Sequence, residues 1–455
     1  MTHEDFNDSA RFNPWWESRG VKVTDVVTRE WWNSLAAINQ HLKHGGKGTP
    51  SVFGYKVMNT FVAFMYNLYR AYLETENGLL TLNMSREIYY NNPMMIPDYV
   101  THDAMVLCRN HLEENGYIIN YSGFYNHKTG EGRKTRVQVT DKLIKLFKTH
   151  KITYQSFRVS EDEPLVVMRD DEGNDHLPDL TYSNMTANLV LKEFRRMAAK
   201  IKFSVDNPTR VEQRKYVNKA DFWNVRMKRI YKQDDGLGGR LYNGFWTNWP
   251  KQLRSKITIN KQAVVELDYS NLHTTMLYIR KGLEPPMGDL YKFKSIKGVP
   301  EYDNRVRQWR KFIKWVTNAM LNCKSSRQLH KLVRTKYNEF INPPLTKDGN
   351  PIKTMKFPKG YVHSAKALNA IKDSILKKHA PVSHLFFNPR LGLGLQRLDS
   401  DIAMRLVLHF QNKGILCMSE HDSFLVAKPY EQELKDKMQE FFKEVMNTEY
   451  EIGVG

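Results

Sequence analysis

The sequence predicts a mixed α+β protein with more than one domain. Residues 53–75 carry apolar side chains at helical spacing, which indicates a largely buried helix. Residues 263–268 instead form a mostly apolar run that ends in a carboxylate, which is typical of a buried strand. Between residues 159 and 178 the composition becomes acidic and rich in turn formers, as at many domain boundaries. At 455 residues and 41% hydrophobic, the chain can bury more than one core.

The charge balance favours a polyanionic partner. Lys and Arg outnumber Asp and Glu by 69 to 49, which gives a formal net charge of +20. Nucleic acid, an anionic membrane and an acidic protein all fit this charge. No basic start precedes an apolar run, and no apolar segment approaches the roughly 20 residues of a membrane span. We therefore expect a cytoplasmic protein without membrane contact.

The cysteines do not suggest a metal site or a disulfide framework. Cys108, Cys323 and Cys417 are scattered, and their number is odd. An unpaired set of this kind fits a reducing compartment. We expect all three to serve in packing.

The N-terminal region, residues 1–155, is predicted to contain a compact DNA-binding module. Ser85 can cap a short helix, and Thr101 can cap a longer one that ends at Gly116. Two strands follow, in residues 117–125 and 134–139, around a polar turn that contains glycine.

The order of helix, helix and two-stranded wing is that of a winged helix, in which the later helix enters the major groove. That helix offers only Arg109 and His111 as evident donors. The wing carries four cations that can neutralise phosphates: Lys128, Arg133, Lys134 and Arg136. The alternative is an ordinary small α/β module whose hairpin is basic because it is solvated.

Two further segments separate this module from the C-terminal half. Residues 156–180 are acidic, and we interpret them as a solvated linker. Residues 181–235 are predicted to be helical and thumb-like, with helices at 183–201 and around 221–233.

Two aspartates in the C-terminal half are the candidate catalytic residues. Asp268 ends a strand just before a helix, so its carboxylate is expected to project from a rigid element. Asp422 is expected at the tip of a hairpin formed by residues 414–426. If the hairpin lies beside the first strand, the two carboxylates can hold two Mg²⁺ ions roughly 3.5–4 Å apart for nucleotidyl transfer. Mg²⁺ takes few protein carboxylates, so two are sufficient.

A helix between these aspartates is the candidate nucleotide-binding element. Residues 310–322 place two cations and two amides at four-residue spacing, on one helical face: Arg310, Lys314, Asn318 and Asn322. Such a face suits a triphosphate. A solvated amphipathic face is the alternative.

These segments together resemble motifs A, B and C of the family A DNA polymerases and the phage-type single-subunit RNA polymerases. The resemblance rests on DYS at Asp268, on the R-x-x-x-K-x-x-x-N helix and on HDSF at Asp422. A Gly-Arg segment at Arg240 resembles the one that precedes motif A in both groups. The resemblance implies a right-hand polymerase palm and fingers in residues 236–455, with residues 325–390 as a fingers insertion.

The resemblance also implies a role for each matching residue. Asp268 and Asp422 would ligate two Mg²⁺ ions, for which Mn²⁺ is the usual substitute, and the Tyr269 carbonyl would be a further ligand. Arg310 and Lys314 would bind the triphosphate, and Lys314 would also protonate the pyrophosphate. Residues near the template–primer duplex and the primer end would be Arg240, Gln396, Asp399 and His421.

Three departures from the family pattern leave the sugar preference open. His273 stands where DNA polymerases have a glutamate gate against the ribose 2′-hydroxyl and RNA polymerases have a small residue. Asn318 and Asn322 stand where aromatic residues are usual. Ser423, after the second aspartate, matches the RNA polymerases, whereas DYS favours DNA.

We expect a template-directed nucleic-acid polymerase with nucleoside triphosphates, a DNA template and a primer or nascent strand as partners. DNA synthesis for a phage or mobile element, in a bacterial or phage-infected cell, is the preferred interpretation. The alternatives are a single-subunit RNA polymerase or primase, and a non-catalytic replication initiator that binds DNA through its winged helix. A two-metal nuclease fits less well, because such enzymes use more clustered acids.

Overall fold

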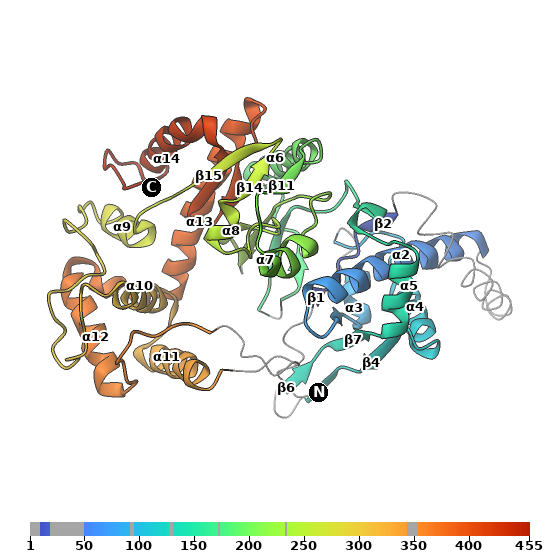
Figure 1. Ribbon diagram of the computed structural model, residues 1–455, viewed down its shortest axis with the longest axis horizontal. Coiled ribbons are helices and arrows are strands. Elements are labelled where there is room, and N and C mark those ends of the chain that lie inside the picture. The colour runs from blue at the N-terminus through green and yellow to red at the C-terminus, as the bar shows by residue number, and fades with distance from the viewer. Residues whose placement is uncertain are drawn as a thin grey trace. The chain divides into compact units, whose positions relative to one another are not determined.

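The protein forms two compact units, which are described separately (Figure 1). The N-terminal unit comprises residues 1–165, 175–177 and 208–225, and the C-terminal unit comprises the remainder. The computed structural model describes residues 10–18, 50–91, 95–126, 131–171, 173–232, 234–343 and 354–455. Helices and sheets occur in both units, which confirms the mixed α+β class.

The described residues of the N-terminal unit form a long helix, four shorter helices and small sheets. Its helices are α2 (Pro50–Glu74), α3 (Arg86–Asn91), α4 (His102–Glu114), α5 (Asp141–Thr149) and α7 (Arg210–Lys215). Its strands are β1 (Ala10–Arg11), β2 (Trp16–Ser18), β3 (Leu79–Leu82), β4 (Ile118–Tyr121), β5 (Phe124–Asn126), β6 (Glu131–Arg133), β7 (Thr135–Val139), β8 (Phe157–Val159) and β10 (Asp175–His176). The main sheet has the order β1-β3-β7-β4, while β2 pairs with β8 and β5 with β6.

The predicted helices of this unit and its strand at residues 134–139 are confirmed, whereas the strand predicted for residues 117–125 is divided into β4 and β5, and residues 131–133 of the predicted turn form β6. The side chain of Thr101 accepts a hydrogen bond from the Ala104 amide at 3.2 Å and so caps α4. Gly116 follows that helix with a φ of +68°, a left-handed conformation that favours glycine. Local signals therefore fix both ends of this helix.

The Thr101 cap is expected to contribute measurably to stability. Thr101→Ala removes the acceptor for an amide that has no partner within the helix, so the free energy of unfolding should fall by about 1 kcal/mol. Urea unfolding of the full chain, followed by tryptophan fluorescence, measures this change. Thr101→Ser keeps the hydroxyl and should lose much less; equal losses in the two variants would show that the cap is not the cause.

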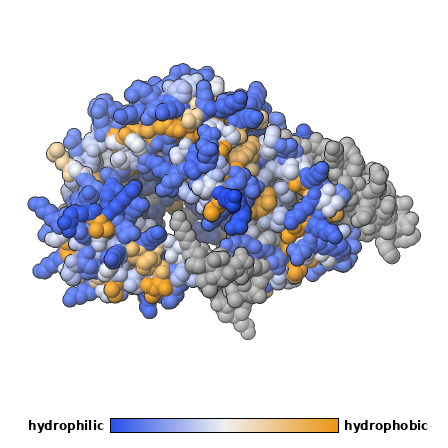
Figure 2. All heavy atoms as spheres, in the orientation of Figure 1, coloured by the Kyte–Doolittle hydropathy of each residue, from blue (hydrophilic) through white to orange (hydrophobic). Residues whose placement is uncertain are grey.

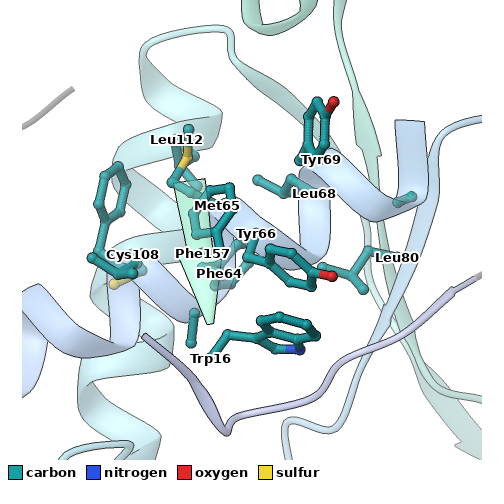
Figure 3. Packing of buried hydrophobic residues seen from close by; sticks show 14 of the residues in the cluster. Trp16, Phe64, Met65, Tyr66, Leu68, Tyr69, Leu80, Cys108, Leu112 and Phe157 are labelled. Carbon is teal, nitrogen blue, oxygen red and sulfur yellow. The ribbon is translucent and has the colours of Figure 1, made fainter. Parts of the chain in front are cut away.

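The core of the N-terminal unit is aromatic. The indole of Trp16 stacks on Tyr66 with ring centroids 3.4 Å apart, and Phe157 meets Tyr66 edge-on at 4.8 Å (Figure 3). All three side chains are buried. The tyrosine hydroxyl reaches out of this cluster to donate to Asp221 at 3.0 Å, and Cys108 is buried in the same core.

The prediction of an acidic linker over residues 156–180 is wrong. Phe157 lies in the aromatic core, and residues 166–169 form strand β9 (Val166–Arg169) of the C-terminal unit. Glu163 is fully buried and accepts a hydrogen bond from the Asn13 side chain at 2.8 Å. The acidic composition suggested solvation, but specific hydrogen bonds stabilise at least this carboxylate inside the fold.

The C-terminal unit is organised around a five-stranded antiparallel sheet with the order β11-β14-β15-β17-β16. These strands are β11 (Phe203–Val205), β14 (Ile257–Ile259), β15 (Gln262–Asp268), β16 (Met418–Glu420) and β17 (Ser423–Ala427). In a second sheet, β12 (Lys228–Lys232) pairs with β9 and with β13 (Asp234–Tyr242). The helices are α6 (Tyr182–Ala198), α8 (Lys251–Arg254), α9 (Leu272–Ile279), α10 (Arg307–Asn322), α11 (Ser326–Ile341), α12 (Ala365–Lys378), α13 (Pro389–Asn412) and α14 (Glu431–Met446).

Two groups of helices accompany the sheets. The long helix α13 contacts β13, α14 and α10, whereas α10 also contacts α11 and α12 (Figure 1). The expected fingers insertion, residues 325–390, thus contains α11 and α12. Within the described part of the chain, every helix is too short or too polar to cross a membrane. The surface drawn in Figure 2 is mostly hydrophilic where it is described.

The helical prediction for residues 181–235 is only partly correct. Helix α6 confirms the first predicted helix, but the second prediction, around residues 221–233, is wrong because β12 occupies this segment. Residues 208–225 also belong to the N-terminal unit, so the predicted thumb-like region is divided between the units. Residues 228–232 are extended because they pair with β13, which follows directly, and with β9, which is distant in sequence.

The Gly-Arg segment is held in place by a buried arginine. Gly239, with a φ of +82°, lies so close to the Tyr231 ring that a Cβ atom would meet it at 2.6 Å. Arg229 is buried, donates to the Gly239 carbonyl at 3.1 Å and binds the Ser400 hydroxyl at 2.6 Å. This contact ties β12 and β13 to α13 and sets the position of Arg240.

Candidate active site

Asp268 stands at the end of the central strand β15. The strand buries Val264 and Leu267, while the Asp268 carboxylate is 42% exposed. Asn271 then adopts a left-handed conformation (φ +58°) and starts helix α9. The predicted strand, turn and helix are confirmed, and the turn leaves the carboxylate accessible at the edge of the sheet.

Asp422 lies in the turn of the hairpin that pairs with the strand of Asp268. The predicted hairpin is formed by β16 and β17, with His421 in the left-handed region (φ +57°) at its turn. In the β15–β17 register Asp268 is opposite Ser423, and the Tyr269 amide donates to the Asp422 carbonyl at 3.1 Å. Asp422 thus immediately precedes the residue that faces Asp268, and the backbones of the two aspartates are neighbours at one end of the β15–β17 pair.

The backbone at Asp268 is also held on its other side. The Asp268 amide donates to the Gly455 carbonyl, and the Asp268 carbonyl accepts from the Gly455 amide, both at 3.1 Å. The Ser270 amide donates to the Gly453 carbonyl at 2.8 Å. The buried Tyr269 side chain donates to the Met438 carbonyl of α14 at 2.6 Å. These bonds leave little freedom in the strand that carries the carboxylate.

Opposite charges surround the two aspartates. The Lys251 ammonium is 3.1 Å from the Asp268 carboxylate. Beneath them, Arg254 forms a bidentate pair with buried Glu266, at 2.6 and 3.0 Å. Within the described residues, no group of three or more His, Cys, Asp or Glu side chains is arranged to hold a metal ion. Any metal here would depend on the aspartate pair and on ligands from outside the protein.

Glu420 adds a protonatable group that the sequence analysis did not single out. Its Oε2 atom is buried, with no hydrogen-bond partner among the described residues. Burial raises the pKa of Glu420 to about 7; Glu266 and Asp422 add to the rise, and Arg254 and Arg240 oppose it. The family motif offered no signal for this residue, because its effect comes from neighbours on other strands.

Glu420 should make the stability of the metal-free protein depend on pH. Between its usual pKa near 4.5 and about 7, the folded protein keeps a proton that the unfolded chain releases, so stability falls as pH rises through this window. Glu420→Gln should remove this fall and gain about 1 kcal/mol relative to wild type between pH 5 and pH 8, allowing for solvent screening. Urea unfolding in EDTA at pH 5 and pH 8 measures the free energy of unfolding of both proteins. If the difference between Glu420→Gln and wild type is the same at the two pH values, the raised pKa of Glu420 is contradicted.

Arg240 does not project freely from the second sheet. Its guanidinium binds the Asp399 carboxylate of α13 through Nη2 at 2.5 Å and Nε at 3.0 Å. The His273 Nε2 of α9 lies 2.7 Å from the same carboxylate and 3.3 Å from Arg240. The structure thus joins the predicted duplex-binding arginine and the predicted sugar-gate histidine through one buried acid.

The environment of Asp399 keeps it ionised. Its side chain is only 1% exposed. Burial alone would raise the pKa of Asp399, but the hydrogen bond from His273 and the charge of Arg240 lower it below its usual value. The carboxylate is therefore a fixed anion that orients two cationic or hydrogen-bonding side chains.

Helix α10 confirms the helix predicted for residues 310–322, and it carries the four residues predicted to bind the nucleotide. Arg310 and Lys314 are half-buried on one face of the helix, and both lie over the Tyr291 ring, at 5.6 and 6.0 Å. Arg310 also forms an ion pair with Asp289. The Tyr291 hydroxyl is 3.1 Å from Thr274, the neighbour of His273, so the ring links this face to α9.

The two amides at the end of this face behave differently. The Asn322 side chain donates to the Asn318 carbonyl at 2.8 Å, which is a contact within the helix. Asn318 is half-buried and Asn322 is exposed. Asn318 and Asn322 therefore follow Lys314 on the same helical face, but the side-chain amide of Asn322 is hydrogen-bonded within the helix.

Two other predicted residues lie near this region. Gln396 is half-buried on α13, one turn before Asp399 and on the same helical face. His421 is half-buried, with its ring 5.7 Å from that of Tyr242. Burial, and then the charge of Arg240, lower the pKa of His421, which favours a neutral imidazole.

The predicted wing cations lie in the N-terminal unit. Lys128 is outside the described residues. Arg133 donates to the Ser122 carbonyl at 3.1 Å, and Arg136 donates to the Lys134 carbonyl at 2.7 Å. All three of these cations are half-buried, so each has part of its surface available to a polyanion.

Comparisons with known proteins give little beyond this geometry. No model of a known protein family matches the sequence, and no curated protein matches it. Among solved structures, it is similar to the polymerase domain of Pol1 from M. smegmatis in complex with DNA primer-template and dNTP. The TM-score is 0.28 and the identity 10%, over 60% of this chain and 50% of that chain. The chain thus spans about half of that structure, and a TM-score of this size establishes neither a shared fold nor a shared activity.

Proposed function

We propose that the protein is a template-directed nucleic-acid polymerase that carries out nucleotidyl transfer with two divalent metal ions. The observation that carries the proposal is the placement of Asp268 at the end of β15 and of Asp422 in the β16–β17 turn, where the Tyr269 amide donates to the Asp422 carbonyl. Two carboxylates carried by neighbouring elements at one end of a sheet would form an anionic centre that a phosphate chain can approach.

The donor set fits Mg²⁺, with Mn²⁺ as a substitute. Both are hard cations that prefer carboxylate and carbonyl oxygens, and Mg²⁺ commonly takes one or two protein carboxylates. Asp268 and Asp422 would hold the ions, with the Tyr269 carbonyl as a further oxygen donor. The Lys251 ammonium at 3.1 Å from Asp268 supports this, because it marks a position that attracts positive charge. When bound, the ions would lower the pKa of the attacking 3′-hydroxyl and neutralise the leaving pyrophosphate.

The α10 face supplies the groups that would bind the nucleotide. Arg310 and Lys314 would contact the triphosphate, and Lys314 would donate a proton to the pyrophosphate as it leaves. Asn318 and Asn322 extend this face. The ion pair between Arg310 and Asp289 is consistent with an anion-binding role, because the arginine already accommodates a carboxylate. A triphosphate would replace that carboxylate.

The buried Asp399 would set the positions of two further contacts. His273, hydrogen-bonded to this carboxylate, would face the sugar of the incoming nucleotide. Arg240 would contact the template–primer duplex with the part of its guanidinium that is not bound to Asp399. Gln396 and His421 would lie near the primer end. In this proposal, residues 236–455 contain the palm and fingers.

We further propose that the N-terminal unit is a winged-helix DNA-binding domain. Its elements α2, β3, α3, α4, β4 and β7 follow one another in the order helix, strand, helix, helix, strand, strand, and the sheet order is β3-β7-β4. Helix α4 would enter the major groove, and the wing cations Arg133, Lys134 and Arg136 would contact phosphates. A DNA-binding domain joined to a small polymerase suits replication of a phage or mobile element.

An incorporation assay tests the polymerase and resolves its sugar preference. The full chain is incubated with labelled dNTPs or NTPs on primed and unprimed DNA templates, with Mg²⁺ or with EDTA. We expect metal-dependent incorporation, with a preference for dNTPs; incorporation of NTPs on unprimed template would identify an RNA polymerase or primase instead. Equal inactivity of wild type and Asp268→Ala in all combinations, with DNA binding retained, would favour a non-catalytic replication initiator.

A further inference from the structure

The N-terminal unit carries a small ribbon whose two faces are both aromatic. Strands β5 and β6 pair with each other and, among the described residues, with no other strand. Phe124 is opposite Arg133 and Tyr125 is opposite Gly132. Successive side chains of a strand point to opposite faces, and residues opposite each other share a face. One face of the ribbon therefore presents Phe124 with Arg133, and the other presents Tyr125 across Gly132.

Both rings are accessible to solvent. The Phe124 side chain is 52% exposed and Tyr125 is 62% exposed. On the first face, the guanidinium of Arg133 lies over the Phe124 ring at 5.7 Å. On the second face, a Cβ atom at Gly132 would meet the Tyr125 ring at 2.6 Å, so the glycine leaves room for the ring against the strand. Each face thus offers a flat ring held against the ribbon rather than a mobile side chain.

We propose that the β5–β6 ribbon binds unpaired nucleobases where double-stranded DNA opens into single strands, with one ring stacking on a base at each face. Exposed flat rings beside cations match the chemistry of single-stranded nucleic acid, whose bases stack on aromatic side chains while its phosphates attract arginine and lysine. Arg133 supplies that charge at the Phe124 ring, and Lys134 and Arg136 follow it closely in the sequence. A fully paired duplex offers no free base face, so the rings would favour an opened end.

This proposal extends the DNA-binding role of the N-terminal unit, because phosphate contacts alone do not distinguish duplex from junction. A ribbon with a stacking ring on each face can hold one base from each separated strand. The unit would then keep a melted segment open, which provides single-stranded template. The property belongs to binding and does not require nucleotide incorporation.

Two measurements test the ribbon: fluorescence anisotropy reports DNA binding, and quenching of 2-aminopurine fluorescence reports base stacking. The probes are a blunt DNA duplex and the same duplex with two unpaired thymidine tails, and the first unpaired base is 2-aminopurine. Wild-type full chain should bind the forked DNA more tightly than the blunt duplex and quench the 2-aminopurine. Phe124→Ala and Tyr125→Ala should each reduce the preference for the fork by roughly 10-fold. Because no nucleotide is added, failure of this test and failure of the polymerase proposal are distinguishable.

Two further variants separate stacking from loss of structure. Tyr90→Ala removes a ring that is 71% exposed on α3 of the same unit, and it should leave the ratio of fork to duplex affinity unchanged. Gly132→Ala keeps both rings but displaces that of Tyr125, and it should reduce quenching. Equal affinity of wild type for fork and duplex, unaffected by loss of both ribbon rings, would overturn the proposal and leave the ribbon as a surface for a protein partner.

Discussion

Replacing Asp422 with asparagine is expected to lower metal-dependent nucleotide incorporation by at least ~1000-fold. Asp422 immediately precedes the residue that pairs with Asp268, and the amide removes one of the two anions that hold the metal ions in the proposed mechanism. The side-chain volume is nearly unchanged, which leaves the hairpin intact. Primer extension with labelled nucleotides over a range of Mg²⁺ concentrations measures the loss, and Asp268→Asn should behave in the same way.

A matched control distinguishes loss of metal binding from a general loss of negative charge. Asp436→Asn removes an exposed carboxylate on α14, and it should retain wild-type incorporation. Affinity for duplex DNA in the absence of metal should be the same in all these variants, because none of them changes a residue proposed to contact DNA. If Asp422→Asn kept activity within a few-fold of wild type, the two-metal site would have to be abandoned.

The positions of these two aspartates could be predicted because their signals are local. A buried strand that ends in Asp268 and a hairpin that turns at Asp422 each follow from a short run of residues, and the structure has both. The pairing of the two strands was also inferable, since both are apolar, one ending at Asp268 and the other beginning directly after Asp422. The resemblance to polymerase motifs added the same two residues independently of periodicity.

The ionic partners could not be predicted, because nothing local marks them. Arg240 and Asp399 are 159 residues apart, and only the packing of α13 against β13 brings them together. The partners in the ion pairs of Lys251 with Asp268 and of Arg310 with Asp289 are closer in sequence. These pairs too form only because the chain between the partners folds back on itself. The same limit explains two wrong predictions. Residues of β12 were expected to be helical, although pairing with other strands makes them extended, and Glu163 was expected to be solvated, although it is buried.

The second large effect is expected for Asp399→Ala, which should lower the free energy of unfolding of the C-terminal unit by about 3 kcal/mol. The change leaves Arg240 and His273 without the acid that binds both, and a cation that loses its partner in a largely buried place is costly. Urea unfolding at neutral pH measures the loss. Asp373→Ala, at an exposed position on α12, should change stability by less than ~0.5 kcal/mol and serves as the control.

The pH dependence identifies the cause of that loss. Because the pKa of Asp399 is lowered in the folded protein, its contribution is present above the usual carboxylate range and is lost as the pH falls through the folded pKa. The difference between wild type and Asp399→Ala should therefore narrow in acid. If the difference in free energy of unfolding between wild type and Asp399→Ala stays constant down to acidic pH, the cause is a packing defect instead.

A double-mutant cycle then separates the ion pair from its individual charges. Asp399→Leu and Arg240→Met together should cost less than the sum of the two single changes, because replacing both partners by apolar groups leaves no unpaired charge. In the double variant His273 remains on α9 but loses the carboxylate that binds it. An effect on the choice between dNTPs and NTPs would therefore appear in this variant without the loss of stability expected for Asp399→Ala. If the double variant is as stable as wild type yet discriminates less between the two sugars, Asp399 acts by positioning His273 rather than by stabilising the fold.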